Sequence, residues 1–229
     1  MFFNLEALAK VMEHLKPSVV FYIGQIPVTT TVVNTWIMML VLVAVALAVT
    51  RRRDFIPRGW QHLPEMAVMF IWGLLESLMG HHGRKFLPLV GTLFILILFL
   101  NLAWLIPGMK PPTMDLSTTA AFGVSTIILV QLIGIREKGF GGYIKQFFTP
   151  SLVLAPLNVI EELVKPVSLS LRLFGNMFGE EMVVTILFLL IPLVIPSTIQ
   201  LLGVLMGFIQ AFVFTLLTTT YIYTKVHGH

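Results

Sequence analysis

Long apolar runs without a charged residue are the feature of this sequence that most limits its fold. Residues 31–50 contain no charged side chain, and Arg51, Arg52 and Arg53 follow them directly. About 20 apolar residues are enough for a helix to cross the hydrocarbon core of a bilayer. The whole chain is only 11% charged and 57% hydrophobic, whereas a soluble domain carries about 25% charged residues. The sequence therefore predicts an all-α, polytopic membrane protein, with residues 1–229 forming a single membrane domain.

Apolar segments of sufficient length predict five spanning helices, at residues 31–50, 87–106, 116–135, 157–191 and 197–223. The fourth would be about 50 Å long at 1.5 Å per residue, so it has to tilt steeply in a core about 30 Å thick. Outside the spans, residues 1–30 are predicted to be an outer segment with a short amphipathic helix around 5–15, and residues 65–80 a helix on the membrane surface. Residues 139–150 are predicted to be a glycine-rich loop.

Basic residues predict the orientation of the chain. Clusters at 51–53 and 136–138 follow spans that would run inward, and basic residues mark the cytoplasmic side of a membrane protein. The N-terminus is therefore expected outside and the C-terminus in the cytoplasm. No small-residue cleavage site follows the N-terminus, so no removable signal peptide is expected. The absence of cysteine excludes disulfides and thiolate metal sites, and the net charge of +4 fits inner loops better than a nucleic-acid surface.

Three charged side chains and one amide interrupt the mostly apolar stretch from residue 167 to 190: Arg172, Glu180, Glu181 and Asn176. A charge inside a membrane is costly, so an ionisable residue there is a functional hypothesis by default. Arg172 cannot avoid this cost by losing a proton, because guanidinium stays charged at physiological pH. It needs an anionic partner or water, and the chain offers few anions at that depth. We therefore expect its main partner on another protein.

Helical periodicity places the polar residues of 157–191 on defined faces. At 100° per residue, six of them fall within about 40° of the Arg172 direction: Asn158, Glu161, Lys165, Ser168, Arg172 and Asn176. This stripe runs from the cytoplasmic end to the middle of the membrane. Glu181 lies about 180° away and toward the outside. Glu161 and Lys165 are four residues apart, so they form either a helix-surface ion pair or the entrance of an inner path.

The last two helices should pack as an antiparallel hairpin with its apex near residue 194. Residues whose numbers add up to about 388 then lie at similar depth, which brings Gln210 within two turns of Arg172. Gly175 and Gly179, and likewise Gly203 and Gly207, have the small-xxx-small spacing that permits close helix approach. Gln210 either belongs to the same polar site or forms a hydrogen bond between helices.

Three segments resemble a known family. Residues 165–176 read KPVSLSLRLFGN and are followed by Glu181, the last helix contains QAFVF from Gln210, and residues 111–119 read PPTMDLSTT. Together they make the chain similar to subunit a of the rotary F-type ATP synthases. The resemblance implies a stator subunit that faces a ring of c subunits, each with one mid-membrane carboxylate. It also implies partners in subunit b of the peripheral stalk, the remaining ATP synthase subunits and the lipid of a bacterial plasma membrane, and no nucleic acid.

The resemblance also implies roles for single residues. Arg172 would be the essential cation, and Glu181, Asn176 and Gln210 would be channel positions, with Glu180 and Ser168 as further candidates. Candidates for the inner half-channel are Glu161, Glu162 and Asn158, and for the outer half-channel Asp115 and Asn101. Asp115 also suits the N-cap of 116–135. Gly203 departs from relatives that have an ionisable residue near this position. No cofactor and no metal site are expected.

Electrostatics suits such a role independently of the resemblance. A fixed cation beside a passing ring attracts each deprotonated carboxylate and disfavours its protonated form. Two offset half-channels then let protons cross only by moving with the ring. The chain would not be catalytic alone, and the sequence does not separate H⁺ from Na⁺ as the carried ion. Other classes fit less well: a secondary transporter predicts inverted repeats, and a membrane redox or lipid enzyme predicts a mid-membrane catalytic cluster.

Overall fold

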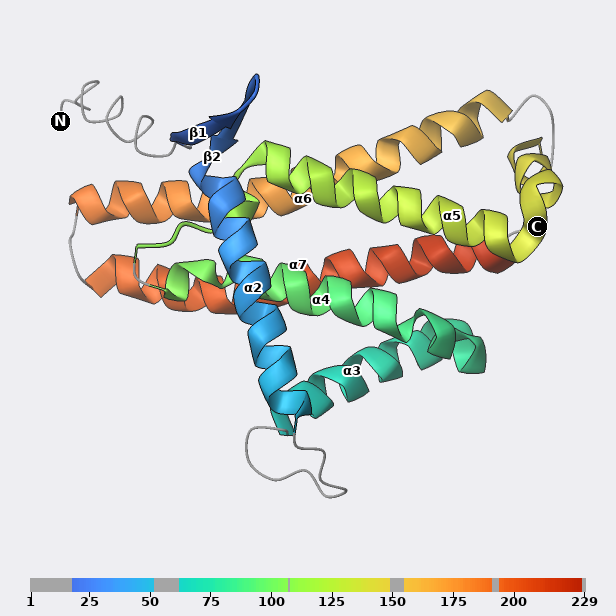
Figure 1. Ribbon diagram of the computed structural model, residues 1–229, viewed down its shortest axis with the longest axis horizontal. Helices are drawn as coiled ribbons and strands as arrows, with labels where there is room; N and C mark the ends of the chain where they lie inside the picture. The colour runs from blue at the N-terminus through green and yellow to red at the C-terminus, as the bar shows by residue number, and fades with distance from the viewer. Residues whose placement is uncertain (1–17, 52–61, 107, 149–154, 191–193, 228–229) are drawn as a thin grey trace.

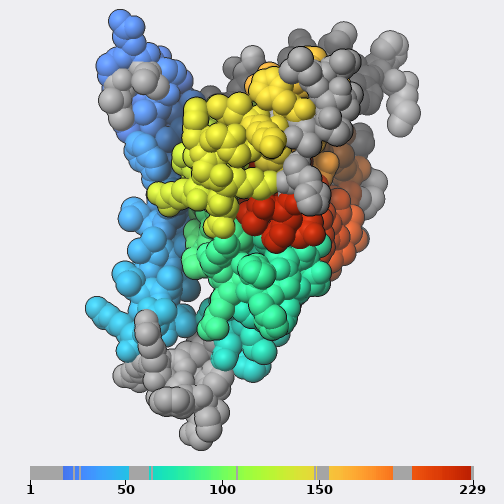
Figure 2. All heavy atoms as spheres, turned by 90° about the vertical axis from the view of Figure 1, so that its right-hand side faces the viewer, coloured from blue at the N-terminus to red at the C-terminus, as the bar shows by residue number. Residues whose placement is uncertain are grey.

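The computed structural model describes residues 18–51, 62–106, 108–148, 155–190 and 194–227. Six long helices make up most of it: α2 (Thr30–Thr50), α3 (His62–Met79), α4 (Leu87–Asn101), α5 (Leu116–Phe148), α6 (Ala155–Leu190) and α7 (Val194–His227). Short 3₁₀ turns, η2 (Gly80–Phe86), η3 (Ala103–Leu105) and η4 (Pro112–Met114), join them. Helices α4 to α7 run alongside one another, while α2 crosses them at a steep angle (Figure 1) and stands at the edge of the molecule (Figure 2).

Four helical segments of the described chain are long and apolar enough to cross a membrane: Thr30–Thr50, Pro64–Asn101, Leu116–Gln146 and Thr198–His227. The second of these combines α3, η2 and α4. Helix α6 is not among them, and it carries Glu161, Glu162, Lys165 and Arg172 in its first half. The expected class, an all-α polytopic membrane protein, is confirmed. That α6 also spans stays a prediction.

Local stereochemistry explains where the helices depart from the expected boundaries. Helix α4 ends at Asn101, and Ile106 is already extended, with φ −86° and ψ 115°. Pro107 follows, and the residue before a proline is pushed out of the helical region. Helix α5 bends at Gly139, with φ 72° and ψ 163°, and then continues to Phe148. The expectation of a loop at 139–150 is therefore wrong for residues 139–148, because the helix continues after the bend. Glycine permits this bend because it adopts the positive φ that a sharp change of direction requires.

The N-terminal part of the described chain also holds a feature that was not expected. Strands β1 (Val19–Ile23) and β2 (Ile26–Thr29) form an antiparallel hairpin around Gly24, whose φ is 64°. Glycine tolerates this left-handed conformation without a steric penalty. The amphipathic helix expected around residues 5–15 lies outside the described residues.

Helices α4 and α7 form the centre of the molecule. Phe94 and Ile97 of α4 and Phe214 and Ile222 of α7 are almost fully buried. Phe70 of α3 packs against this centre, with its ring 5.9 Å from Phe94 and 5.6 Å from Phe212. On α6, Leu169 and Leu173 are buried as well. Because these two leucines face the core, the opposite side of α6 faces outward.

Two of the four glycines expected at helix contacts serve that purpose. Gly203 lies under the side chain of Glu180, and a Cβ at Gly207 would be 3.3 Å from Asn101 Cβ. Gly175 and Gly179 have no neighbour within 4 Å of a built Cβ among the described residues, so no described helix of this chain approaches closely there, and close helix approach at these two positions stays a prediction. The tight contact lies at Gly123 of α5, where a Cβ would stand 2.7 Å from the Pro166 carbonyl oxygen of α6.

We expect Gly123→Ala to separate α5 from α6. The added methyl group would also overlap Ser170 Oγ, and the backbone of Pro166 cannot move aside as a side chain can. Overpacking of this kind costs about 1–3 kcal/mol, which thermal unfolding of the purified protein would show as a lower midpoint. Gly73→Ala is the matched control, because a Cβ there meets no atom of the described residues within 4 Å. Equal midpoints for the two variants would contradict the contact.

Candidate functional site

Arg172 lies on the outward face of α6. Its side chain is exposed, and within the described residues the guanidinium makes no hydrogen bond or ion pair. At 100° per residue Arg172 lies about 60° from the buried Leu169 and about 100° from the buried Leu173, at the border of the core-facing side, and its exposure shows that the side chain extends outward. Ser168, one turn earlier, is half-buried, and Asn176, one turn later, is exposed. The result is an outward-facing polar stripe with a permanent cation at its centre.

Asn176 joins this stripe to α7. Its Nδ2 donates a hydrogen bond to Gln210 Oε1 at 2.6 Å. Gln210 is only 3% exposed, and its Nε2 is buried with no partner among the described residues. The structure thus brings Gln210 to the stripe one helical turn from Arg172, close to the depth that the hairpin register predicted. Glu162 of α6 and Lys225 of α7, which form an ion pair at 2.8 Å, follow the same register.

Glu180 and Glu181 occupy different environments. The carboxylate of Glu180 covers Gly203 of α7, so that a Cβ there would overlap Glu180 Oε1. Glu181 is half-buried, and its backbone carbonyl accepts a hydrogen bond from Thr185 Oγ1 at 2.7 Å. Glu181 was expected as a channel position toward the outside, with Glu180 as a further candidate. The structure places the Glu180 carboxylate between α6 and α7, in the space left by the missing side chain of Gly203.

A polar cluster of five residues, which we call the Glu162 cluster, lies at the start of α6: Gln131, Tyr143, Glu162, Lys165 and Lys225. Glu162 Oε1 is 2.6 Å from Lys165 Nζ and 2.8 Å from Lys225 Nζ. Its other oxygen accepts a hydrogen bond from Gln131, whose Oε1 accepts one from the Tyr143 hydroxyl at 2.7 Å. The expected Glu161–Lys165 pair also forms, at 3.2 Å. No local motif in the sequence marks three members of this cluster as site residues: Gln131, Tyr143 and Lys225.

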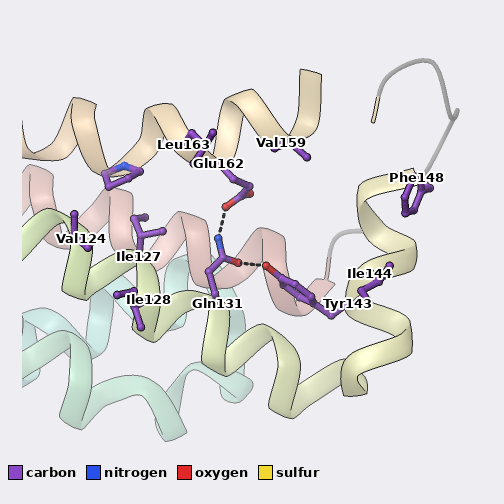
Figure 3. A pocket seen from close by; sticks show the side chains of 11 residues that line it. Val124, Ile127, Ile128, Gln131, Tyr143, Ile144, Phe148, Val159, Glu162 and Leu163 are labelled. Atoms are coloured by element: carbon purple, nitrogen blue, oxygen red, sulfur yellow. Dashed lines mark hydrogen bonds between the residues drawn. The ribbon is translucent and has the colours of Figure 1, made fainter. Parts of the chain in front are cut away.

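A cavity of about 560 Å³ opens beside the Glu162 cluster. Figure 3 shows side chains of α5 and α6 around it, with Gln131 between Tyr143 and Glu162 in the middle of the lining. Its lining is largely apolar: Val124, Ile127, Ile128, Ile144, Phe148, Val159, Leu163 and Pro166, together with Gln131, Tyr143 and Glu162.

The remaining candidates have structural partners. Asp115 Oδ1 accepts hydrogen bonds from the backbone N–H and the hydroxyl of Ser117, at 3.0 and 2.7 Å, which confirms the expected N-cap of α5. Its Oδ2 accepts a bond from Thr31 Oγ1 at 2.6 Å, tying α5 to α2. Asn101 Nδ2 donates to the Gly207 carbonyl at 3.1 Å, and its Oδ1 is buried without a partner in the described chain. Asn158 is half-buried, one turn before Glu162.

Known proteins place these observations in a family. Residues 32–223 match the family described as ATP synthase A chain. The chain is 67% identical to an ATP synthase subunit a of Moorella thermoacetica, over 95% of this chain and 100% of that protein. It is 45% identical to ATP synthase subunit a 1 of Syntrophotalea carbinolica, over 83% of each chain. A Geobacter subunit a is also 45% identical, over 86% of this chain and 88% of that protein. The chain therefore belongs to the ATP synthase A chain family.

Proposed function

We propose that the chain is the membrane stator of a rotary ATP synthase, in which Arg172 separates two offset half-channels that exchange protons with the carboxylates of a c-ring. One observation carries this proposal. Arg172 is a permanent cation on an exposed face of α6, with no hydrogen bond or ion pair in the described part of the chain. Such a charge in a membrane protein requires a partner, and a moving ring of carboxylates provides one at every step.

The surroundings of Arg172 suit a transient rather than a tight ion pair. Coulomb attraction at short distance grows strongly as the effective dielectric falls, so a dry, fixed pair would stop a rotor. Asn176 and Gln210 offer polar groups one turn away. Gly175, beside them, leaves open space on the same helix. A ring helix can therefore pass close to Arg172 while its carboxylate is only briefly attracted.

The outer half-channel is proposed to pass Glu180 and Glu181. Glu180 lies at the α6–α7 contact above Gly203, on the apex side of Arg172. A carboxylate between two helices can take up a proton from one side and release it to the other. Asn101 is a candidate further along this path, because its buried Oδ1 is available as an acceptor.

We expect Glu180→Gln to slow ATP-driven proton pumping more than Glu181→Gln does. The amide cannot carry a proton, and Glu180 is the residue whose carboxylate enters the helix interface. Pumping rates of inverted vesicles, with assembly checked by subunit content, would measure the effect. A larger loss with Glu181→Gln would restore Glu181 as the main relay.

The inner half-channel is proposed to follow the exposed part of the stripe, from Asn158 and Glu161 past Ser168 to Arg172. Glu162 is less suited to carry protons, because two lysines hold its carboxylate. The proposed topology puts this end of α6 on the cytoplasmic side, with the C-terminus, in a bacterial plasma membrane. The subunit itself is not catalytic and acts with a c-ring, subunit b and the other ATP synthase subunits.

Cysteine crosslinking tests the proposed ring contact. The chain contains no cysteine, so each introduced thiol is unique within it. Ser168→Cys and Asn176→Cys, one turn on either side of Arg172, should crosslink to a cysteine beside the carboxylate of the c subunit. Phe174→Cys, turned about 160–200° from Arg172 at 100° per residue, is the control. Crosslinking from position 174 alone would contradict the proposed orientation of α6.

A further inference from the structure

The cavity beside the Glu162 cluster is lined mostly by apolar side chains, as a site for a hydrocarbon chain would be. Val124 and Ile128 of α5 and Leu163 of α6 line one part, Ile144 and Phe148 of the bent end of α5 line the other, and Gln131, Tyr143 and Glu162 lie between them (Figure 3). Its volume of about 560 Å³ falls in the range of about 300–1,000 Å³ typical of small-molecule sites. Val124, Ile128 and Leu163 are exposed, Leu163 at 66%. The cavity is therefore open toward the surroundings of an integral membrane protein.

The bent end of α5 forms one wall of this cavity. After the Gly139 bend, Phe140, Ile144 and Phe148 are spaced four residues apart and are all exposed, Phe140 at 68%. Residues four apart share one face of a helix. An exposed apolar face beside basic residues is typical of a helix that lies in the membrane interface. Gln146 Nε2 fixes this segment to α7 by donating a hydrogen bond to the Thr224 carbonyl at 3.0 Å. Figure 2 shows the C-terminal part of α5 (yellow) next to the C-terminal part of α7 (red).

We propose that this cavity binds one acyl chain of an anionic phospholipid, with the lipid phosphate at the bent end of α5. The apolar walls would hold the chain, and the bent end of α5, which carries Lys145, would lie at the level of the lipid headgroup. The proposal rests on the membrane location of the chain and does not require the proposed ion path. It assigns a lipid site to residues that the proposed ion path does not use; Glu162, an inner half-channel candidate in the sequence, lines the cavity.

Charge at this end favours an anionic headgroup. Basic residues outnumber acidic ones there: Arg136, Lys138, Lys145, Lys165 and Lys225 stand against Glu137, Glu161 and Glu162. Glu137 is paired with Lys85 at 2.7 Å, and the half-buried Lys165 and the buried Lys225 are held by Glu162, so the attraction of a headgroup rests on Arg136, Lys138 and Lys145. Each basic residue near a membrane surface contributes about 1 kcal/mol to the attraction of anionic lipid. That energy corresponds to about a fivefold preference.

Size and direction argue against a protein helix as the occupant. A helix is about 10 Å across and rises about 5.4 Å per turn, so a space of 560 Å³ holds little more than one turn. The cavity also lies on another side of α6 from Arg172. Leu163 comes nine residues before Arg172, which places it about 180° around the helix. A ring that contacts Arg172 would leave this side of α6 uncovered.

Photolabelling of the whole complex tests the site. The complex is placed in phosphatidylcholine vesicles that contain a trace of phosphatidylglycerol with a photoreactive group in its acyl chain. After irradiation, labelled peptides of this chain are quantified. Label on the Leu163 peptide should exceed label on the α2 peptide around Leu40, an exposed apolar reference. The same photoreactive chain on phosphatidylcholine should label the Leu163 peptide about fivefold less.

Two variants and one control variant sharpen the test. Ile128→Trp should fill the cavity and lower labelling at Leu163, whereas Ile37→Trp on α2, also exposed, should leave it unchanged. Lys145→Gln should reduce the preference for phosphatidylglycerol while the complex stays assembled. Labelling at Leu163 no stronger than at Leu40 would overturn the site. Equal labelling by both lipids would overturn the anionic headgroup, and a crosslink to another subunit instead of lipid would show that protein covers the cavity.

Discussion

Replacing Arg172 with alanine is expected to abolish ATP-driven proton pumping by the assembled complex. Without the fixed cation, a ring carboxylate has no electrostatic reason to lose its proton at this point, and nothing repels a proton that crosses directly between the half-channels. The complex should still assemble, because an exposed side chain without an internal ion pair contributes little to stability. Inverted vesicles containing the variant would be assayed for pumping, and purified complex for subunit content.

Two controls separate loss of the site from loss of charge in general. Arg136→Ala removes another exposed arginine, just before the bend of α5 at Gly139, and should leave pumping largely intact. Arg172→Lys should fail nearly as completely as alanine, since ammonium is strongly hydrated and loses its proton more readily on burial. An assembled Arg172→Ala complex that pumps at the normal rate would disprove the role given to this residue.

Glu162→Gln is expected to have the second large effect, on stability rather than on transport. The change removes the negative charge that contacts both Lys165 and Lys225, and the Lys225 side chain is only 6% exposed. Breaking a buried pair by removing one partner costs about 3–5 kcal/mol. Thermal unfolding of the purified complex should therefore show a lower midpoint, and less of the subunit should be recovered from membranes.

Glu161→Gln is the matched control for this prediction. Its pair with Lys165 is longer, at 3.2 Å, and the Glu161 side chain is 66% exposed, so the cost should be about 0–1 kcal/mol. The double variant Glu162→Gln, Lys225→Gln should recover part of the lost stability, because the buried cation is removed as well. If Glu162→Gln assembled with normal stability but failed to pump, Glu162 would belong to the inner half-channel instead.

Properties that depend on local spacing were predictable from the amino-acid sequence. Apolar runs such as 31–50 indicated a helical membrane protein, and the helical period placed Arg172 and Asn176 on one face of α6. The segment around Arg172 was sufficient to indicate the family. Asp115 was predictable as an N-cap because the capping residue and the helix it caps are adjacent in sequence.

Only the tertiary structure decided which polar groups meet. Glu162 contacts Lys225 from the last turns of α7, Glu180 covers Gly203, and Gly123 rather than Gly175 carries the tight helix contact. The bend at Gly139, which creates the cavity beside α6, could not be distinguished from a loop by its glycines. The physical reason is that periodicity defines the face of each helix, whereas partner choice depends on how helices distant in sequence pack, rotate and shift along one another.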